Sequence, residues 1–551
     1  MDDNKKNTNQ ELQGNADTIK KIDSNDLDLP EVVRAPHLYE AIISFLGIVV
    51  VMSIGIIVYG VDPHIPMFIG VIIAALISIK IGYKWQDIEG MMIHGISMAM
   101  QAILILCIVG MMIGVWILSG TIPTMIYYGL KLLSPSIFLI AAVLICSITS
   151  LATGSSWGTM GTMGLALMGI ATGMGMPLGP TAGAILAGAY FGDKMSPLSD
   201  TTNLAPAMAG TDVFTHVKYM IKATIIAYAI ALIFFGVYGY MHATSGEVDT
   251  SQATVIMDGI KDAFNISPVL LLPPLVVILA IALKMPAIPG ITLGVVAGAI
   301  LAPIFQGDLA IIDPETMKID HYGVNFGDIL VMARNGFTMN SDIEAVNSLL
   351  TNGGLMNMAS SILMTVMAMM FGGIMEGTHQ LETIVNRLLK HIKSGPALVG
   401  ATELTCIVSN AVMPEQYISI LVPGRMFAPA YRQMGIHPKS LSNALESAGT
   451  VTSALIPWNT CGVYIENTLN IEPLMWIPWA VFNYTMPIVS FLLTFPKITC
   501  TKMTEEEQKK EAQGEAAGTD GKTDDKGVLS EIMDDMSESI DAQEGNLETT
   551  G

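Results

Sequence analysis

The stretch that decides the fold is Gly192-Asp-Lys-Met-Ser-Pro-Leu-Ser-Asp-Thr-Thr-Asn-Leu-Ala-Pro206, which lies between two long apolar runs. Asp193, Lys194 and Asp200 put charges where a membrane-buried helix would carry hydrocarbon side chains. The prolines lack a backbone N–H, so carbonyl groups here lose their helical partners. Lipid accommodates such a segment only when protein surrounds it or water reaches it. We therefore expect a discontinuous transmembrane helix whose charged residues are candidates for function.

The composition of the whole chain indicates a polytopic, all-α membrane protein. Of its 551 residues, 51% are hydrophobic and only 14% are charged, and the mean hydropathy is +0.54. Soluble domains carry about 25% charged residues. Helices are expected because they satisfy their own backbone hydrogen bonds in lipid. The apolar segments fall near 41–59, 64–80, 97–118, 136–152, 160–176, 180–192, 220–240, 267–283, 287–304, 356–375, 397–413, 440–456 and 473–495.

The formal net charge of −21 lies largely in the polar ends of the chain. Residues 1–38 and the acidic residues 499–551 have the composition of disordered segments, and we expect both to be cytoplasmic tails. An acidic surface repels nucleic acid, so nucleic acid is not expected as a partner. The five cysteines form no Cys-x-x-Cys pair and the histidines do not cluster, so no cofactor is expected. These cysteines are Cys107, Cys146, Cys406, Cys461 and Cys500.

The order of the apolar segments repeats once along the chain. Residues 39–240 and 267–498 each contain two spans, an interfacial stretch, a span, a hairpin, a broken span and a final span. In this interpretation each half crosses the membrane an odd number of times, which makes the halves inverted repeats joined by an extracellular linker at 241–266. The hairpins, at 136–176 and 397–430, would be re-entrant. Paired discontinuous helices in inverted repeats are typical of secondary transporters with a midplane site.

The placement of basic residues gives the expected orientation. With the N-terminus in the cytoplasm, most lysines and arginines near the spans fall on the cytoplasmic side, as the positive-inside rule requires. The C-terminus then lies in the cytoplasm as well. The basic residues assigned to that side are Lys80, Lys84, Lys218, Lys222, Lys284, Arg387, Lys390, Lys393, Arg425, Arg432, Lys439 and Lys497.

Two polar breaks in the first half offer oxygen ligands for a hard cation such as Na⁺. The hairpin break, 149–159, contains the hydroxyls of Ser155 and Ser156, although a run of small residues can also serve close helix packing alone. The second break contributes the carboxylates Asp193 and Asp200, but Asp193 could instead form a structural ion pair with Lys194. The remaining candidates in this break are Ser199, Thr201, Thr202 and Asn203.

The second half has two corresponding breaks. In the hairpin break, 409–417, the candidates are Asn410 and Glu415. Glu415 is either a ligand or the cap of a helix that begins at Pro414, because acidic groups favour a helix N-terminus. The last break, 446–462, begins with Glu446 in an otherwise uncharged segment, where a buried, hydrogen-bonded glutamate is the structural alternative. Its other candidates are Thr450, Asn459 and Thr460.

Three motifs resemble one family of transporters. They are Gly192-Asp-Lys-Met-Ser-Pro-Leu-Ser-Asp-Thr-Thr-Asn203, Thr153-Gly-Ser-Ser-Trp-Gly-Thr159 and Leu455-Ile-Pro-Trp-Asn-Thr460. Together they are similar to the NhaC family of Na⁺/H⁺ antiporters, and the resemblance runs through about residues 38–498. It implies a multi-pass protein of the bacterial inner membrane, within the ion-transporter superfamily, with inverted repeats, re-entrant hairpins and a homodimeric assembly.

The expected activity is export of cytoplasmic Na⁺ in exchange for external H⁺, with Asp200 and Glu446 as the exchangeable carboxylates. The alternative is a malate-H⁺/lactate-Na⁺ exchanger of the same family, for which Arg425 could supply a fixed cation. An intramembrane enzyme is not expected, because the spans contain no His-Glu-x-x-His motif and no converging Ser, His and Asp set. A channel is disfavoured by the paired broken helices without a repeated pore motif.

Overall fold

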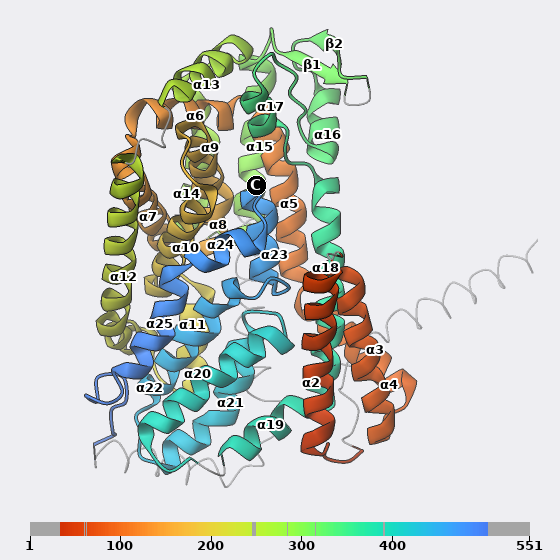
Figure 1. Cartoon of the computed structure of the whole chain (residues 1–551), viewed down its shortest axis with the longest axis vertical. Helices are drawn as coiled ribbons and strands as arrows, with labels where there is room; N and C mark the ends of the chain where they lie inside the picture. Colours follow the sequence, from red (N-terminus) through yellow and green to blue (C-terminus); the bar gives the residue numbers. More distant parts are fainter. Residues whose placement is uncertain are drawn as a thin grey trace, which may run out of the picture.

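The computed structural model describes residues 33–59, 61, 63–244, 250–283, 285–313, 316–389 and 392–504. The tails expected at 1–38 and 499–551 therefore lie mostly outside the described residues, as do part of the linker 241–266 and the side chains of Lys284 and Lys390. Within the described part the chain is almost entirely helical, with a single two-stranded sheet at one end of the molecule (Figure 1). The expectation of an all-α architecture is confirmed.

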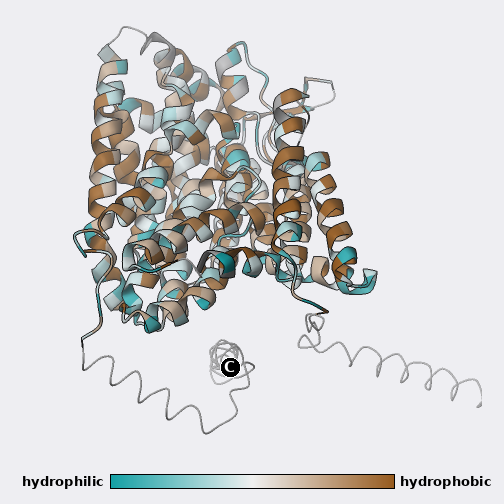
Figure 2. Ribbon diagram, turned by 60° about the horizontal axis from the view of Figure 1, so that its bottom comes forward, coloured by the Kyte–Doolittle hydropathy of each residue, from teal (hydrophilic) through white to brown (hydrophobic). Residues whose placement is uncertain are grey.

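The lengths and hydropathy of the helices confirm a polytopic membrane protein. Six helices in the described ranges are long and apolar enough to cross a membrane, and a seventh span results if one pair bent by 102° is counted as one. Apolar residues run along most of the long helices, and hydrophilic residues are most evident at helix ends and turns (Figure 2). The six helices are His64–Ile81, Met100–Leu118, Pro135–Thr153, Val213–Thr244, Ala287–Phe305 and Leu355–Gly377.

The first half of the chain is a series of helices with the interruptions expected at 149–159 and 192–206. The elements are α2 (Leu38–Ser53), η1 (Ile54–Val58), α3 (His64–Ile81), α4 (Trp85–Met98), α5 (Met100–Leu118), α6 (Thr121–Leu132), α7 (Pro135–Thr153), α8 (Ser156–Thr159), η2 (Met160–Gly164), α9 (Leu165–Met174), α10 (Leu178–Met195), α11 (Asp200–Ala209) and α12 (Val213–Thr244).

The second half begins within the linker and carries the interruptions expected at 409–417 and 446–462. Its first elements are α13 (Thr250–Ala263), η3 (Pro268–Leu271), α14 (Leu272–Ala282), α15 (Ala287–Phe305), β1 (Ala310–Asp313), β2 (Lys318–Tyr322), α16 (Phe326–Asn335), α17 (Glu344–Leu350), η4 (Leu355–Met358) and α18 (Ala359–Gly377). The later elements are α19 (Gln380–Leu389), α20 (Gly395–Val412), α21 (Ile418–Gln433), α22 (Pro438–Ala444), η5 (Leu445–Thr450), η6 (Ser453–Leu455), α23 (Thr460–Leu469), α24 (Pro473–Trp476), η7 (Ile477–Trp479) and α25 (Val481–Leu492).

Two helical hairpins approach the centre of the molecule from opposite ends. In the first, α7 starts shortly after α6, and the end of α9 returns to α6, where Gly173 contacts the side chain of Leu130. In the second, the Thr402 hydroxyl near the start of α20 lies 3.1 Å from the Tyr431 hydroxyl near the end of α21. Figure 1 shows α6 and α9 in the upper part and α20 and α21 in the lower part. The inverted relationship of the two whole halves stays a prediction.

Close packing of α10 on α7 fixes the position of the central polar stretch. Gly188 and Gly192 on α10 lie so near the backbone of α7 that an added Cβ at either residue would overlap it. Ser150 on α7 strengthens the contact by donating to the carbonyl of Ala189 at 2.6 Å. Small residues permit this approach of two helices within a membrane protein. The C-terminal end of α10, with Asp193 and Lys194, is therefore held firmly against the first hairpin.

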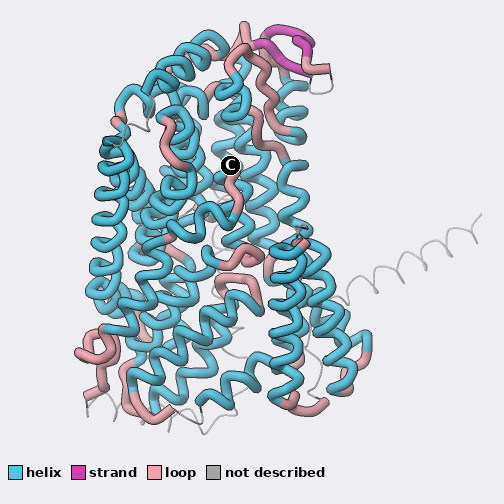
Figure 3. The backbone as a smooth tube through the Cα atoms, in the orientation of Figure 1, coloured by secondary structure: helices cyan, strands magenta, loops and turns pink. Residues whose placement is uncertain are grey.

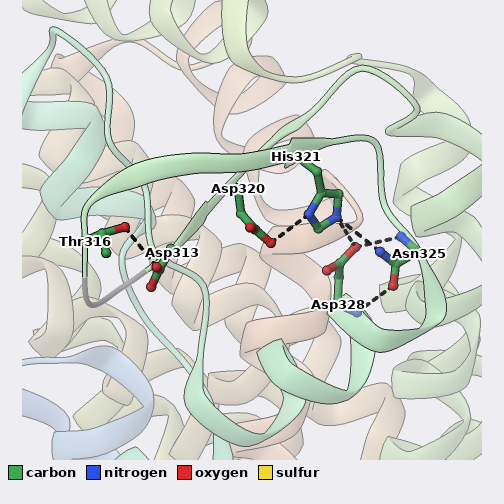
Figure 4. Close-up of polar contacts among 6 residues, drawn as sticks. All are labelled: Asp313, Thr316, Asp320, His321, Asn325 and Asp328. Carbon is green, nitrogen blue, oxygen red and sulfur yellow. Dashed lines mark hydrogen bonds and ion pairs between the residues drawn. The ribbon is translucent and has the colours of Figure 1, made fainter.

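A polar cluster ties the small sheet to α16 at one end of the molecule (Figure 4). The imidazole of His321 on β2 lies 3.0 Å from Asp320 through Nδ1 and 3.0 Å from Asp328 through Nε2. Asn325 caps α16 by accepting from the backbone N–H of Asp328 at 3.2 Å. The hydrogen bond to Asp328, with a second one to Asp320, raises the pKa of His321 above its ordinary value of 6.5. Protonation of His321 therefore strengthens this cluster.

The chain remains attached to the helices a few residues beyond the predicted start of the C-terminal tail. His437 donates its backbone N–H to the carbonyl of Thr501 at 2.9 Å, and Met503 donates to the carbonyl of Gly435 at 2.9 Å. Ile436 and Lys502 also form an isolated antiparallel bridge. Residues 499–503 thus pair with the turn between α21 and α22 in the structure.

Candidate functional site

The four interrupted helices meet in the middle of the molecule, where short loop segments lie among the helices (Figure 3). Gly154 at the tip of the first hairpin has φ +67, and an added Cβ there would lie 2.8 Å from the backbone nitrogen of Ser199. At the tip of the second hairpin, the carbonyl of Pro414 accepts from the backbone N–H of Thr460 at 2.9 Å. Each hairpin tip therefore contacts the broken helix of its own half.

Asp193 lies at the centre of the first-half contacts. It belongs to the last turn of α10, and only 5% of the residue is exposed. The Ser156 hydroxyl donates to its Oδ2 at 2.6 Å, and the Ser199 hydroxyl donates to its Oδ1 at 2.5 Å. Short hydrogen bonds of this kind are typical of hydroxyls that donate to an ionised carboxylate. The sequence candidates Ser156, Asp193 and Ser199 are thus brought together.

A hydroxyl bridge connects this group to Glu446 in the second half. The Ser199 and Thr201 hydroxyls lie 3.1 Å apart, and the Thr201 hydroxyl donates to Glu446 Oε1 at 3.3 Å. Glu446 is completely buried in the π-helical segment η5, and its Oε2 has no hydrogen-bond partner among the described residues. The buried Thr450 hydroxyl on the same segment also has no partner within that part of the chain. Buried polar groups are normally hydrogen-bonded, so this carboxylate oxygen and the neighbouring hydroxyl are candidate ligands for a hard cation.

Lys194 brings a positive charge to the same cluster. The residue is completely buried, and its Nζ donates to the Ser447 hydroxyl at 3.2 Å. The ammonium group is attracted to Glu446 and also to Glu403 on α20. Sequence analysis left open a structural ion pair between Asp193 and Lys194. Within the described ranges these two side chains form no ion pair. Asp193 instead accepts from Ser156 and Ser199, and Lys194 donates to Ser447.

The second-half breaks are joined by their amide side chains. Asn410 donates to the carbonyl of Gly449 at 2.8 Å, and Asn459 donates to the carbonyl of Asn410 at 3.1 Å. Asn459 also caps α23 by accepting from the backbone N–H of Cys461 at 3.0 Å, and Thr460 starts that helix. These contacts fix the backbone around η5, and through it the orientation of Glu446.

Glu415 occupies a capping position. Its Oε2 accepts from the backbone N–H groups of Tyr417 at 2.6 Å and Ile418 at 3.2 Å. The helix that it caps begins at Ile418, and not at Pro414 as the capping alternative supposed. The interruption is longer because Pro414 has no N–H and the backbone around it is not helical until Tyr417. A ligand role for Glu415 stays a prediction.

Four candidates from the first half lie at the edge of the cluster. Asp200 is exposed at the start of α11 and accepts only a long hydrogen bond, 3.3 Å, from the Tyr417 hydroxyl. Asn203 is also exposed, and it donates to the carbonyl of Ser199 at 2.7 Å. The Thr202 hydroxyl donates to the carbonyl of Asp193 at 3.0 Å. Ser155 caps α8 by accepting from Gly158 at 3.0 Å. In this structure Glu446 is therefore bridged to Asp193 and not to Asp200.

Sequence reasoning missed Glu403 as a member of the cluster. Only 4% of this residue is exposed, and its Oε1 has no hydrogen-bond partner among the described residues. Its position within the apolar segment 397–413 is the same signal that identified Glu446, a lone carboxylate in a hydrophobic run. Arg425, considered as a fixed cation, is instead exposed on α21 and interacts electrostatically with Glu376.

Comparisons with known proteins agree on one family. Residues 188–498 match the model of the Na⁺/H⁺ antiporter family. The chain is 37% identical to the malate-2H⁺/Na⁺-lactate antiporter of Bacillus subtilis, across 82% of this chain and 93% of that protein. It is 35% identical to the Na⁺/H⁺ antiporter NhaC of Alkalihalophilus pseudofirmus, across 82% of this chain and 94% of that protein. It is 36% identical to NhaC of Bacillus subtilis, across 79% and 93% respectively.

Proposed function

The chain belongs to the Na⁺/H⁺ antiporter family, and from this premise we propose that it exports cytoplasmic Na⁺ in exchange for external H⁺ across the bacterial inner membrane. The observation that carries the proposal is the buried bridge from Asp193 through Ser199 and Thr201 to Glu446. Among the described residues Glu446 Oε2 has no hydrogen-bond partner. Hard cations prefer carboxylate and hydroxyl oxygens. This bridge supplies such oxygens from both halves of the protein.

In this mechanism Na⁺ and H⁺ compete for the same carboxylates. The hydroxyl groups of Ser156, Ser199 and Thr201 retain lone pairs for Na⁺ while their protons rotate away. When Na⁺ leaves, a proton takes its place on Asp193 or Glu446, because an ionised carboxylate without a partner is costly in a buried site. Exchange follows if the site changes sides only when it is loaded. Asp200 would then act at the edge of the site and not as an exchanging group.

The membrane potential can contribute to the exchange. One elementary charge that crosses 100 mV gains or loses about 2.3 kcal/mol. Transport is therefore driven by voltage if unequal numbers of Na⁺ and H⁺ are exchanged. Among the described residues of the site, the buried ammonium of Lys194 is attracted to the buried carboxylates Glu403 and Glu446. The buried carboxylate of Asp193 adds a third negative charge without an ion pair to Lys194 in those residues. This excess of negative charge favours binding of more than one mobile cation.

The test is reconstitution of the purified protein in proteoliposomes that contain a pH-sensitive dye. An imposed Na⁺ gradient is expected to move H⁺ in the opposite direction in the wild type, and Glu446→Gln is expected to abolish that flux. Asp308→Asn is the matched control, because Asp308 is an exposed carboxylate between α15 and β1. A wild type that moves no H⁺ in response to Na⁺ would refute the proposal.

A malate-H⁺/lactate-Na⁺ exchange is the second candidate. It is favoured by the 37% identity to the malate-2H⁺/Na⁺-lactate antiporter of Bacillus subtilis. The buried ammonium of Lys194, which could attract a substrate carboxylate, also favours it. The same proteoliposomes distinguish the two candidates. Uptake of labelled malate driven by internal lactate would support the second one, whereas H⁺ movement with Na⁺ alone supports the first.

We also propose, from the family resemblance and the distribution of basic residues, that both termini are cytoplasmic and that the protein is a homodimer without cofactor or catalytic activity. Reporter fusions at each terminus test the orientation, since a periplasmic reporter must stay inactive at both. Light scattering of the purified protein in detergent tests the assembly, and a monomer mass would refute the dimer.

A further inference from the structure

Glu403 is a buried carboxylate that the proposed exchange does not yet use. It lies in the middle of α20, with 4% of the residue exposed. Its Oε1 has no hydrogen-bond partner among the residues that the structure describes. An ionised carboxylate in such surroundings requires a compensating positive charge. The compensating group must come from the neighbouring helices.

Lys194 is positioned to supply that charge. Its ammonium is attracted to Glu446 on η5 and to Glu403 on α20. The group has three donors, and among the described residues one of them is used, in the 3.2 Å hydrogen bond to the Ser447 hydroxyl. Hydrogen bonds continue from Ser447 to Asn443 at 3.4 Å and from Asn443 to Ser490 at 2.9 Å. A lysine ammonium on its flexible four-carbon stem can reorient without backbone movement. His216 on α12 also interacts electrostatically with Lys194, and it bonds to Ser442 at 2.8 Å.

We propose that Glu403 is a positioning residue that receives the Lys194 ammonium whenever Na⁺ occupies Glu446. This inference rests on the proposed Na⁺/H⁺ exchange. In the absence of Na⁺ the ammonium pairs with Glu446, so that a proton exchanged for Na⁺ lies on Asp193. When Na⁺ binds to Glu446, the ammonium turns toward Glu403, so that the two cations use Glu446 in turn. The arriving ammonium displaces the proton that Glu403 carries in the absence of Na⁺. The O–H bond of Glu403 breaks, and that H⁺ leaves the site as Na⁺ enters.

The inference predicts that Glu403 reduces the competition between the Lys194 ammonium and Na⁺ for Glu446. Without Glu403 the ammonium has no second carboxylate and competes with Na⁺ for Glu446. Glu403→Gln should therefore raise the KM for Na⁺ by about tenfold with kcat unchanged, which corresponds to about 1.4 kcal/mol. Glu403→Asp should restore much of the wild-type KM because it returns the charge. A purely structural role would lower the amount of active protein and leave KM unchanged.

The matched control is Glu376→Gln. Glu376 on α18 also has a buried carboxylate oxygen without a hydrogen-bond partner among the described residues. The positive groups that act on it are Arg425 and His379, and Lys194 is not among them. Its replacement is expected to leave the KM for Na⁺ unchanged. An unchanged KM in Glu403→Gln, or an equal rise in both variants, would overturn the inference.

A second measurement uses the wild type and does not depend on the folding of a variant. An apolar groove of about 490 Å³ between α20 and α25 is lined by Glu403, Leu404, Pro487 and Phe491 among others. It gives a small hydrophobic carbodiimide, which reacts with protonated carboxyl groups, access to Glu403. Other titratable groups near Glu403 are Cys406 and Tyr431.

Labelling of Glu403, read by mass spectrometry, is expected to fall when Na⁺ replaces choline, because the arriving ammonium keeps Glu403 ionised. This readout requires no transport. If the wild type exchanges Na⁺ for H⁺ but labels Glu403 equally with and without Na⁺, only this inference fails. If the wild type shows neither Na⁺-driven H⁺ flux nor Na⁺-dependent labelling, both proposals fail.

Discussion

Replacement of Asp193 by asparagine tests the proposed ion site most directly. Asparagine has nearly the same shape, and the hydroxyls of Ser156 and Ser199 can rotate to suit an amide in place of the carboxylate that they now contact at 2.6 and 2.5 Å. The fold should therefore tolerate the change. The variant loses one negative charge, which is the property that a bound cation requires.

The size of the effect follows from the electrostatics of a buried pair. A cation about 4 Å from a carboxylate gains about 4 kcal/mol at an effective dielectric constant of about 20. Loss of that interaction weakens binding by about a thousandfold, since each 1.4 kcal/mol is about tenfold. We expect Asp193→Asn to show no Na⁺ binding by calorimetry and no Na⁺-driven H⁺ flux in proteoliposomes.

Two controls make the result decisive. Thermal unfolding in detergent should give a Tm close to that of the wild type, which separates loss of binding from loss of folding. Asp308→Asn, which removes an exposed charge, should retain full exchange. An Asp193→Asn protein that is folded and still binds Na⁺ with wild-type affinity would refute the assignment of the site to this carboxylate.

Three further predictions concern the surroundings of the site. Asp200→Asn should retain exchange with less than about a tenfold change in the KM for Na⁺, because the Asp200 side chain is exposed. Complete loss of flux would show that Asp200 is one of the carboxylates that exchange Na⁺ and H⁺. Gly154→Ala should destabilise the protein by about 1–3 kcal/mol, because Gly154 has φ +67 and its added Cβ would overlap the loop after α10; an unchanged Tm would contradict that contact. The raised pKa of His321 means that the folded protein binds this proton more tightly. The contribution of the His321–Asp328 pair is therefore present below the ordinary pKa of 6.5 and is lost as pH rises through the raised value. His321→Gln should lower the free energy of unfolding at about pH 5.5 by no more than about 1 kcal/mol, seen as a lower Tm, and should leave Tm unchanged at about pH 8.5. An equal fall in Tm at both pH values would refute the charge-based explanation.

The helical segments and their interruptions could be predicted from the sequence because both depend on local chemistry. An apolar run of sufficient length specifies a spanning helix in lipid, and a proline or glycine run breaks it wherever it occurs. The break at 192–206 was predicted in this way, and the structure interrupts the helix between Met195 and Asp200. The helix after Pro414 was placed too early, because its start depends on where Glu415 can cap the chain.

The partners of the charged residues could not be predicted from local pattern. Asp193 and Asp200 lie in one polar stretch and are equally plausible ligands by composition. The fold turns Asp193 inward at the end of α10 and leaves Asp200 exposed at the start of α11. Glu403 was overlooked because its importance depends on Lys194, which comes from the other half of the chain.

The sequence by itself determined a hydrophobic, all-helical membrane protein with four polar interruptions, and its motifs indicated the family. Only the tertiary structure decided that Asp193, not Asp200, is bridged to Glu446 and that the buried ammonium of Lys194 is attracted to both Glu446 and Glu403. The physical reason is that hydropathy and helix breaking act over a few residues. The hydrogen bond from Thr201 to Glu446 joins residues 245 positions apart, and only the packing of the hairpins and broken helices brings them within reach.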